Sequence, residues 1–583
     1  MPAPVEPAAR LRPVPGAAAA LIAGLVHAAS FAPLGAWWLQ LAAQAVLAAL
    51  LLRVPAAGGS ARGALLGFAF GLGWFTAGVS WVYISMHRYG GMPAPVAALA
   101  VVLFAAYLAL FPTAVAAATL RARAYAAARG AGDTLSGAPL AGIALLFAGS
   151  WGLAEIARGY LFTGFPWLAT GYAHVDGPLA GLAPVVGVYG VSACAALVAF
   201  GLGTLVHGLT ARHAPPAVAP AASPSVVHGR GATRGSAAAM AGALTVAPLV
   251  AGLAAGGIDW SHPSGQPLQV RLLQGNVAQE MKFDPARTLE AMRSYVDEVR
   301  RAEAALTVLP ETAWTLPWSF TPEPLRAALA AHLEHNGGML AIGMPLPEAA
   351  ASGRAAPEAG APDAGARDAG APVADAPDAG MPRLTNSVAV IGPDGNITAR
   401  YDKRHLVPFG EFVPRGFGWF VAMMDIPLGE FGRGAAHQPP IAIGDQRVAF
   451  DICYEDLFGE ELAVQVRDGA TILANVSNIA WFGDSLALPQ HLQIARMRAI
   501  ELARPVLRST NTGVTAAIDA HGRILGRLPV YVADALEASV QGTAGLTPYA
   551  RAGNAAPLAL GIALVLGGAA ATRARRRAHG RTR

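Results

Sequence analysis

Long apolar stretches recur along most of this sequence, and they constrain its fold more than any other feature. A helix needs about 17–25 apolar residues to cross a bilayer. Eight stretches approach that length: 16–34, 37–52, 63–84, 93–117, 138–158, 180–208, 236–257 and 555–571. Hydrophobic residues make up 54% of the chain and charged residues only 14%, which is too apolar for an ordinary soluble protein. We therefore expect an integral membrane protein with a polytopic α-helical bundle of about eight spans, although the two short first stretches could form one hairpin.

Arginines flank these stretches at alternate ends. They precede the first stretch, link the second to the third, the fourth to the fifth and the sixth to the seventh, and follow the last: Arg10, Arg12, Arg53, Arg62, Arg121, Arg123, Arg129, Arg212, Arg230, Arg234, Arg573, Arg575, Arg576 and Arg577. Basic residues favour the cytoplasmic side of a membrane. This pattern predicts that both chain ends are cytoplasmic and that residues 259 to about 550 face the other side. Because the net charge of +5 comes from arginines beside apolar segments, we expect no nucleic-acid partner.

The loops predicted on the side opposite the cytoplasm are rich in aromatic residues and glycine. One of them contains Gly164-Phe165-Pro166-Trp167, followed by Tyr172 and His174. Its simplest interpretation is an aromatic belt at the membrane interface. Just before it, Glu155 and Arg158 are three residues apart, so they would share a helix face and could pair.

After Gln269 the hydrophobic period changes to that of an α/β domain. Strands are expected at 270–273, 305–309, 339–343, 387–391, 397–401, 446–452, 471–475, 506–508 and 514–519, and helices at 285–301, 324–335, 460–467 and 489–504. Alternating strands and helices, with hairpin turns at 393–396 and 520–522, favour an α/β sandwich.

Three regions follow from this pattern. We expect a membrane bundle of seven helices over residues 1–258, an extracytoplasmic domain over 259–550, and a last membrane helix with a basic cytoplasmic tail over 551–583. Residues 349–381 repeat Ala, Pro, Asp and Gly with almost no large apolar side chain. Such a segment cannot bury enough surface to order itself, so we predict a disordered insert without a chemical role.

The chain has only two cysteines, and their positions differ. Cys194 lies inside an apolar stretch, whereas Cys453 follows the predicted strand 446–452 at a strand-to-turn corner in the extracytoplasmic domain. Compartments outside the cytosol favour disulfides, so an unpaired cysteine there needs another function. A nucleophile at the end of the sheet is one interpretation; a buried, inert cysteine is the other.

Three short segments each place one reactive side chain at a strand end: Leu309-Pro310-Glu311, Tyr401-Asp402-Lys403 and Asp451-Ile452-Cys453. This order and spacing of Glu, Lys and Cys resembles the nitrilase superfamily, and within it the apolipoprotein N-acyltransferase family. Further segments carry the same resemblance: Gly164-Phe165-Pro166-Trp167, Gln274-Gly275-Asn276, 476–483, 493–505, 508–513 and 545–551. The resemblance covers nearly the whole chain.

The resemblance implies an αββα sandwich beside the membrane bundle and a ping-pong acyl transfer. Cys453 would accept an acyl chain from a membrane phospholipid as a thioester. It would then pass the chain to the α-amine of an N-terminal diacylglyceryl-cysteine, the last step of bacterial lipoprotein biosynthesis. The enzyme would lie in the bacterial inner membrane, with its catalytic domain in the periplasm. We expect a monomer. We also expect no metal or cofactor, because the sequence shows no metal-ligand cluster or phosphate-binding glycine loop.

Chemical reasoning gives each residue of the Glu–Lys–Cys set a role. A thiol needs a nearby base or cation to become a thiolate at neutral pH, so Glu311 is the candidate general base for Cys453. Lys403 would favour the thiolate and, with the backbone N–H of Tyr454, would stabilise the tetrahedral oxyanion.

Supporting and substrate-binding residues follow from the resemblance. Glu411 and Glu455 match carboxylates that would orient Lys403 and shape the pocket. Phe283 stands where relatives commonly have Trp at a position expected to contact the acyl chain, and Trp419 and Trp481 are further candidates. Ile479 replaces a frequent Asp, so we expect no polar role there. The apolar segment 417–431 is either core or a mobile arm that dips into the membrane interface.

Two other functions compete with acyl transfer. A membrane-anchored amidase of the same fold would hydrolyse C–N bonds with water as the acceptor. Soluble amidases carry out this reaction without a membrane bundle, so the bundle would be unexplained. An inactive transporter or lipid-binding scaffold would not need Glu311, Lys403 and Cys453, all of which are present.

Overall fold

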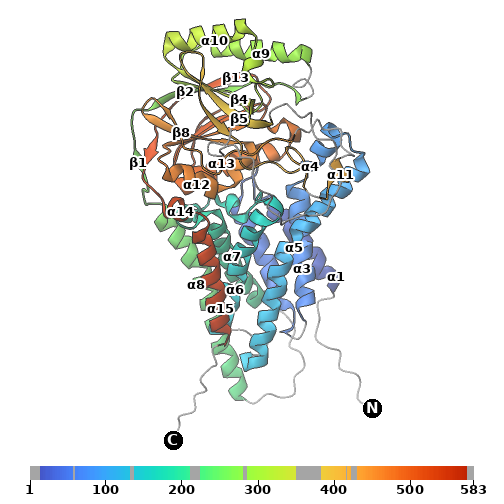
Figure 1. Cartoon of the computed structure of the whole chain (residues 1–583). Coiled ribbons are helices and arrows are strands. Elements are labelled where there is room, and N and C mark those ends of the chain that lie inside the picture. The colour runs from blue at the N-terminus through green and yellow to red at the C-terminus, as the bar shows by residue number, and fades with distance from the viewer. Residues whose placement is uncertain are drawn as a thin grey trace, which may run out of the picture.

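The computed structural model describes residues 13–56, 59–131, 137–210, 224–279, 285–348, 383–414, 416–421 and 430–573. A bundle of long helices forms its lower part and a two-sheet sandwich its upper part (Figure 1). The insert 349–381, Phe283 and the terminal arginines Arg10, Arg12, Arg575, Arg576 and Arg577 lie outside the described residues.

Each of the eight predicted apolar stretches contains a helix. These helices are α1 (Pro13–Ala28), α2 (Trp37–Arg53), α3 (Gly59–Gly78), α5 (Ala94–Ala126), α6 (Ala138–Tyr160), α7 (Ala183–Thr210), α8 (Pro224–Ala255) and α15 (Ala555–Arg573). Within the described part of the chain, five helices are long and apolar enough to cross a membrane, or six if α3 is joined to the bent segment Val82–Tyr89. Because α1 and α2 have only 16 and 17 residues, the count of eight spans is not confirmed.

Small residues allow the bundle helices to approach one another closely. A Cβ atom added at Gly63 of α3 would lie 2.6 Å from the carbonyl oxygen of Ala116 on α5, and one added at Gly67 would lie 2.5 Å from that of Pro112. Membrane helices cannot use the hydrophobic effect to associate, so backbone packing at such positions replaces it. The glycines of α3 are therefore part of the packing and not simply apolar filler.

The upper part contains two six-stranded sheets. One sheet has the order β13-β2-β3-β4-β5-β6 and the other β12-β11-β10-β9-β8-β7. Their strands are β2 (Leu268–Gln274), β3 (Leu306–Val308), β4 (Met339–Pro347), β5 (Leu384–Ile391), β6 (Ile397–Asp402), β7 (Ile441–Ile443), β8 (Gln446–Ile452), β9 (Ile472–Ser477), β10 (Val506–Thr510), β11 (Ala516–Ile518), β12 (Ile524–Arg527) and β13 (Asp534–Val540). A short pair, β1 (His262–Pro263) with β14 (Thr543–Ala544), lies apart from them.

Helices cover the outer face of each sheet. Apolar side chains of α9 (Pro285–Val299) and α10 (Glu323–Asn336) pack on the first sheet, and those of α12 (Gly459–Arg467) and α13 (Ala487–Leu502) pack on the second. The inward-facing side chains of both sheets form a separate core between them. The predicted αββα sandwich is therefore present, and the predicted strands and helices all have counterparts in it.

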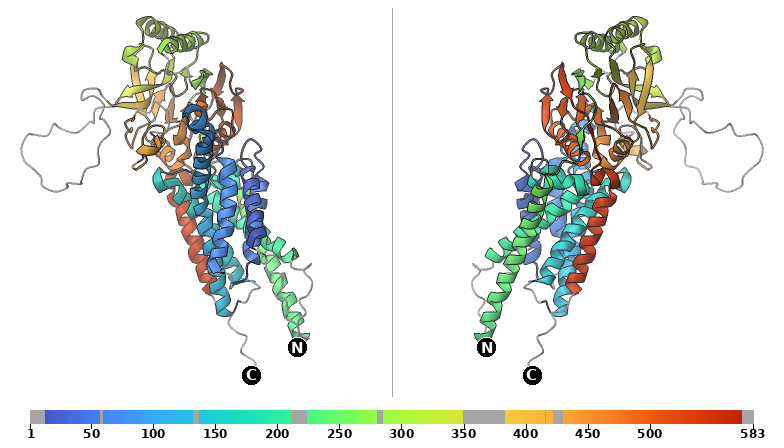
Figure 2. Two further views of the ribbon diagram at one scale, coloured as in Figure 1. Left: turned by 90° about the vertical axis from the view of Figure 1, so that its right-hand side faces the viewer. Right: turned by 90° about the vertical axis from the view of Figure 1, so that its left-hand side faces the viewer.

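The layer formed by α12 and α13 rests on the top of the bundle (Figures 1 and 2). One apolar cluster runs across the junction and includes Phe458, Leu488 and Met497 from the sandwich together with Trp151 and Trp167 from the bundle. The sandwich and the bundle thus share a continuous core and are not joined merely by a linker.

The loop between α6 and α7 makes much of this junction, which corrects the expectation of an aromatic belt. Trp167, Tyr172 and His174 are buried, whereas Phe162 in the same loop is 84% exposed. Trp167 donates a 2.8 Å hydrogen bond from Nε1 to Gln490 of α13. The loop therefore packs against the α12–α13 layer of the sandwich.

The expected pairing of Glu155 with Arg158 is wrong. Glu155 instead accepts hydrogen bonds from the indole of Trp151 and from the hydroxyl of Thr170. Arg158 donates to the backbone carbonyls of Phe165 (2.6 Å) and Trp167 (2.7 Å). Both side chains therefore hold the α6–α7 loop through hydrogen bonds from helix α6.

Candidate active site

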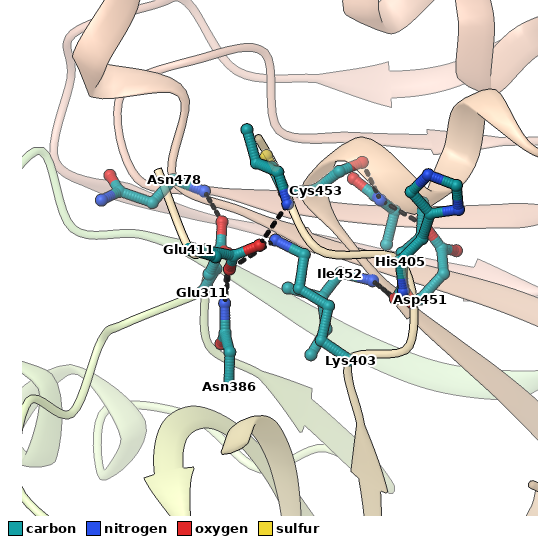
Figure 3. A network of polar contacts seen from close by, with 12 residues as sticks. Glu311, Asn386, Lys403, His405, Glu411, Asp451, Ile452, Cys453 and Asn478 are labelled. Atoms are coloured by element: carbon teal, nitrogen blue, oxygen red, sulfur yellow. Dashed lines mark hydrogen bonds and ion pairs between the residues drawn. The ribbon is translucent and has the colours of Figure 1, made fainter. Parts of the chain in front are cut away.

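The strand directions explain why three distant segments meet at one edge of the sandwich. Strands β2, β3 and β4 are parallel to one another, as are β8, β9 and β10. Two antiparallel steps, β4–β5 and β5–β6, make β6 run in the same direction as β4. Glu311 lies three residues after β3, Lys403 directly after β6 and Cys453 directly after β8. The carboxyl ends of these strands therefore bring the three side chains together, as Figure 3 shows.

Glu311 is fixed by donors on both carboxylate oxygens. Its Oε1 accepts from Lys403 Nζ (3.1 Å) and Asn386 Nδ2 (2.7 Å), and its Oε2 accepts from the backbone N–H of Asn478 (2.7 Å). Burial acts to raise its pKa, but the charge of Lys403 and these hydrogen bonds outweigh burial, so the pKa is lowered. Glu311 is thus an ionised carboxylate held in one orientation.

Lys403 is the positive centre of the cluster. Its side chain is 1% exposed, and its Nζ lies 3.1 Å from Glu311 and 2.9 Å from Glu411. Burial acts to lower the pKa of the ammonium, but the two carboxylates outweigh it and raise the pKa above its ordinary value. Lys403 therefore stays charged, which a buried amine needs carboxylate partners to do.

Cys453 occupies a strained corner. Its φ of +54° lies in the left-handed region, which side chains other than glycine rarely adopt. The thiol is half-buried; burial raises its pKa well above the ordinary range, the charge of Glu311 raises it further, and the charge of Lys403 opposes them. Lys403 acts in the expected direction, but the raised pKa favours the protonated thiol of Cys453.

Glu455 joins the Lys403 segment to the Cys453 segment. Its Oε1 accepts from the backbone N–H groups of Arg404 (2.7 Å) and His405 (3.0 Å). Its Oε2 accepts from the N–H of Ile452 (2.8 Å) and the hydroxyl of Tyr401 (3.0 Å). Burial raises the pKa of Glu455 to about 7. Its position is that of a supporting group between two loops.

Glu411 and Asn386 complete the surroundings of Lys403. Glu411 accepts from Lys403 Nζ (2.9 Å), from Asn386 Nδ2 (2.7 Å) and, through Oε2, from the N–H of Val407 (2.8 Å). Asn386 bridges Glu311 and Glu411, yet the sequence analysis did not select it. The available signal was the run of three polar residues, Thr385, Asn386 and Ser387, at the start of strand β5.

Tyr454 reaches from the catalytic corner into the bundle. Its hydroxyl donates a 2.8 Å hydrogen bond to the carbonyl oxygen of Gly164 in the α6–α7 loop. Its backbone N–H belongs to the first residues of the 3₁₀ turn Cys453–Leu457, where amide groups have no acceptor within the helix. That N–H is available to a ligand in the site.

The other candidate substrate-binding residues lie apart from the cluster. Trp419, on the short helix α11 (Gly418–Val421), is 64% exposed. Trp481 is half-buried, and its ring lies 5.9 Å from that of Tyr89 in the bundle. Ile479 is buried in the apolar cluster at the junction, in agreement with a position that has no polar role. In the arm, Phe420 and Val421 pack near Met86 and Met92 of the bundle, and residues 422–429 lie outside the described structure.

Among the described residues, no group of three or more His, Cys, Asp or Glu side chains is placed to hold a metal ion. The carboxylates of Glu311 and Glu411 both pair with Lys403 Nζ. A thiol beside an oriented carboxylate, a fixed ammonium and a free backbone N–H can perform nucleophilic acyl substitution.

Comparison with known proteins matches both parts of the chain. Residues 23–201 match the family model described as apolipoprotein N-acyltransferase N-terminal domain, and residues 269–549 match the one described as carbon-nitrogen hydrolase. An apolipoprotein N-acyltransferase of Ralstonia nicotianae is 44% identical over 575 residues, covering 98% of this chain and 95% of that protein. One of Bordetella bronchiseptica is 41% identical over 593 residues, covering 95% and 96%. Among solved structures, a carbon-nitrogen hydrolase from Helicobacter pylori aligns with a TM-score of 0.33 at 16% identity, covering 47% of this chain and 88% of that one.

Proposed function

The chain belongs to the apolipoprotein N-acyltransferase family, and we propose that it transfers an acyl chain from a membrane phospholipid to the N-terminal α-amine of a diacylglyceryl-cysteine on lipoproteins. The observation that carries this proposal is that Cys453 lies beside the buried ion pair of Glu311 and Lys403, in a sandwich that shares its core with an apolar bundle. A lipid substrate and a lipidated acceptor both suit this placement.

The first half of the proposed reaction makes a thioester. Cys453 Sγ attacks the carbonyl carbon of the phospholipid ester while Glu311 takes the thiol proton. Lys403 Nζ and the backbone N–H of Tyr454 stabilise the oxyanion. The ester C–O bond then breaks, Glu311 returns the proton to the departing alkoxide, and a lysophospholipid leaves.

The second half regenerates the thiol. The α-amine of the acceptor cysteine attacks the thioester carbonyl and forms the amide, and the C–S bond breaks. Glu311 takes a proton from the amine, and this proton restores the thiol of Cys453. An α-amine has a pKa near 8, so a substantial fraction is already deprotonated at neutral pH.

The proposed placement follows the arginine pattern. Residues 1–258 and 551–583 form the membrane part, and residues 259–550 form the catalytic domain on the periplasmic side of a bacterial inner membrane. The chain would act as a monomer without a cofactor.

Substrate contacts are proposed for the aromatic residues near the junction. Trp481 and Trp419 lie on elements that pack beside the bundle, and Phe283 is proposed for the acyl chain from the resemblance alone. These three would line the route between the lipid and Cys453.

The rival functions account for fewer of the observations. A hydrolytic amidase does not need a sandwich whose core continues into membrane helices. A scaffold does not need a buried ammonium between two carboxylates beside a thiol.

The transfer itself is tested with the purified full chain in phospholipid vesicles, to which a synthetic peptide with an N-terminal diacylglyceryl-cysteine is added. The proposal predicts a peptide that gains one acyl group on its α-amine. Release of free fatty acid without peptide modification would instead favour the hydrolase.

A further inference from the structure

The carbonyl group of Cys453 is held by two side chains that the proposed chemistry does not use. His491 Nε2 of α13 lies 3.2 Å from this oxygen, and Asn475 Nδ2 of β9 lies 3.3 Å from it. The carbonyl belongs to a residue with a left-handed φ. Both contacts therefore act on a strained backbone position of the site.

The partner of the other ring nitrogen settles the tautomer of His491. Arg508 Nη2 lies 2.5 Å from His491 Nδ1. A guanidinium can only donate, so Nδ1 accepts and the ring proton resides on Nε2. That proton faces Asp456 Oδ2 at 2.9 Å and the Cys453 carbonyl at 3.2 Å. His491 is thus a neutral donor aimed at the nucleophile's backbone; burial and the charge of Arg508 lower its pKa in agreement, although Asp456 opposes them.

The orientation of Asn475 is set by the same arginine. Arg508 Nη1 donates to Asn475 Oδ1 at 3.0 Å, which leaves the amide nitrogen of Asn475 for Asp451 Oδ1 at 2.5 Å and for the Cys453 carbonyl. All of these side chains are buried. Arg508 Nε and Asp456 Oδ1 have no hydrogen-bond partner among the described residues, but the remaining paired contacts of this buried network limit the movement of its side chains.

A residue of the membrane bundle, Trp167, also contacts this network. The ring of Trp167 lies 5.4 Å from that of His491 at an interplanar angle of 35°, and its indole N–H bonds the neighbouring Gln490. Arg158 in turn holds the carbonyl of Trp167. A bundle residue therefore packs directly on the donor that holds Cys453.

Peptide geometry connects this network to catalysis. The carbonyl of Cys453 and the N–H of Tyr454 belong to one planar trans peptide and point in opposite directions. Fixing the carbonyl on one side fixes the direction of the N–H on the other, and hydrogen bonds to the carbonyl polarise that N–H.

We propose that His491 and Asn475 are positioning residues that clamp the Cys453 carbonyl and thereby aim the Tyr454 N–H at the oxyanion, and that Trp167 of the bundle holds this clamp in place. The inference rests on the proposed acyl transfer. If it holds, the direction of the Tyr454 N–H depends on the contact between the sandwich and the membrane bundle.

Two reactions of the same thiol test the clamp. Acylation by a diacyl phospholipid passes through an oxyanion, whereas alkylation by iodoacetamide does not. His491→Phe keeps a ring against Trp167 but removes the donor, and His491→Gln restores a donor. We expect His491→Phe to slow acylation of Cys453 by about 10–100-fold, because the oxyanion donor would be misdirected but not removed. The rate of alkylation should stay within about twofold of wild type, because that reaction forms no oxyanion. His491→Gln should recover most of the acylation rate.

Arg496→Gln is the matched control, because Arg496 lies on the same helix and pairs with Asp176 of the bundle without touching the clamp. It should leave both rates near wild type. If His491→Phe does not fold, Trp167→Leu carries the test, since it removes the packing on His491 without unpairing a buried charge; it should also lower acylation selectively. Equal acylation by wild type and these folded variants, or a parallel change in both reactions, would overturn the clamp. A wild-type enzyme that forms no acyl adduct would instead overturn the proposed function.

Discussion

The ammonium of Lys403 lies 3.1 Å from the carboxylate of Glu311, and each group keeps the other charged inside the protein. The pKa of Glu311 is lowered and that of Lys403 is raised despite burial, whereas the pKa of the Cys453 thiol is raised. The resting site therefore holds a carboxylate, an ammonium and a protonated thiol. Because of these protonation states, one substitution can slow acyl transfer to Cys453 and yet make the same thiol easier to alkylate.

Replacing Glu311 by Gln should affect acylation and alkylation in opposite directions. Acyl transfer should fall by about 10²–10⁴-fold, because the general base is lost. The negative charge of Glu311 raises the pKa of Cys453, so its removal should lower that pKa. The pH midpoint of iodoacetamide alkylation should shift to lower pH than in wild type. A midpoint that stays in place or rises would contradict the assigned electrostatics.

Replacing Lys403 by Met should harm both reactions. Loss of an oxyanion donor should slow acyl transfer by about 10²–10³-fold. Because Lys403 lowers the pKa of Cys453, the alkylation midpoint should rise. Lys403→Arg should not restore activity, because a planar guanidinium does not occupy the position of a compact ammonium. Full activity of either variant, measured on folded protein, would exclude Lys403 from the mechanism.

Glu455 should be sensitive even to replacement by Gln. Its two oxygens accept from three backbone N–H groups and the Tyr401 hydroxyl, but a glutamine amide has only one acceptor oxygen. Glu455→Gln should therefore lower the stability of the sandwich by about 1–3 kcal/mol through unpaired buried donors. The exposed Glu323, which pairs with Arg326, provides the control: Glu323→Gln should change stability by no more than about 0.5 kcal/mol. Thermal unfolding in detergent compares the two variants. Equal unfolding temperatures for both would contradict the proposal that the hydrogen bonds of Glu455 hold the two loops together.

Much of the fold was predictable because local patterns determine it. The strand Gln446–Ile452 has the predicted bounds, since a short apolar run between polar residues permits few alternatives. Glu311, Lys403 and Cys453 could be selected because strand-end motifs carry them. The membrane helices were located, but α1 and α2 have only 16 and 17 residues, so the count of eight spans stays a prediction.

The parts that were missed depend on contacts between distant residues. Asn386 lies between Glu311 and Glu411 only because β5 returns antiparallel beside β4. His491 lies in a helix motif whose local pattern says nothing of Arg508 or of the Cys453 carbonyl. Trp167 suggested an interfacial belt because tryptophan suits both a membrane interface and a buried protein junction.

The glycines of α3 provide a test of the bundle. A side chain at Gly67 would meet the Pro112 carbonyl oxygen of α5 at 2.5 Å from its first carbon, so Gly67→Leu should separate these helices. We expect a lower yield of folded protein and a lower unfolding temperature in detergent. Gly208 of α7 is exposed and has open space beside it; Gly208→Leu should unfold near the wild-type temperature. The same loss in both variants would show that packing against α5 is not the cause.

The thioester on Cys453 is the central claim, and the intact mass of the purified enzyme after incubation with a diacyl phospholipid tests it most directly. The account predicts one added acyl group that hydroxylamine removes, that maps to Cys453 and that is absent in Cys453→Ala. A folded wild-type enzyme that modifies lipoprotein peptide without ever carrying this adduct would contradict the covalent mechanism.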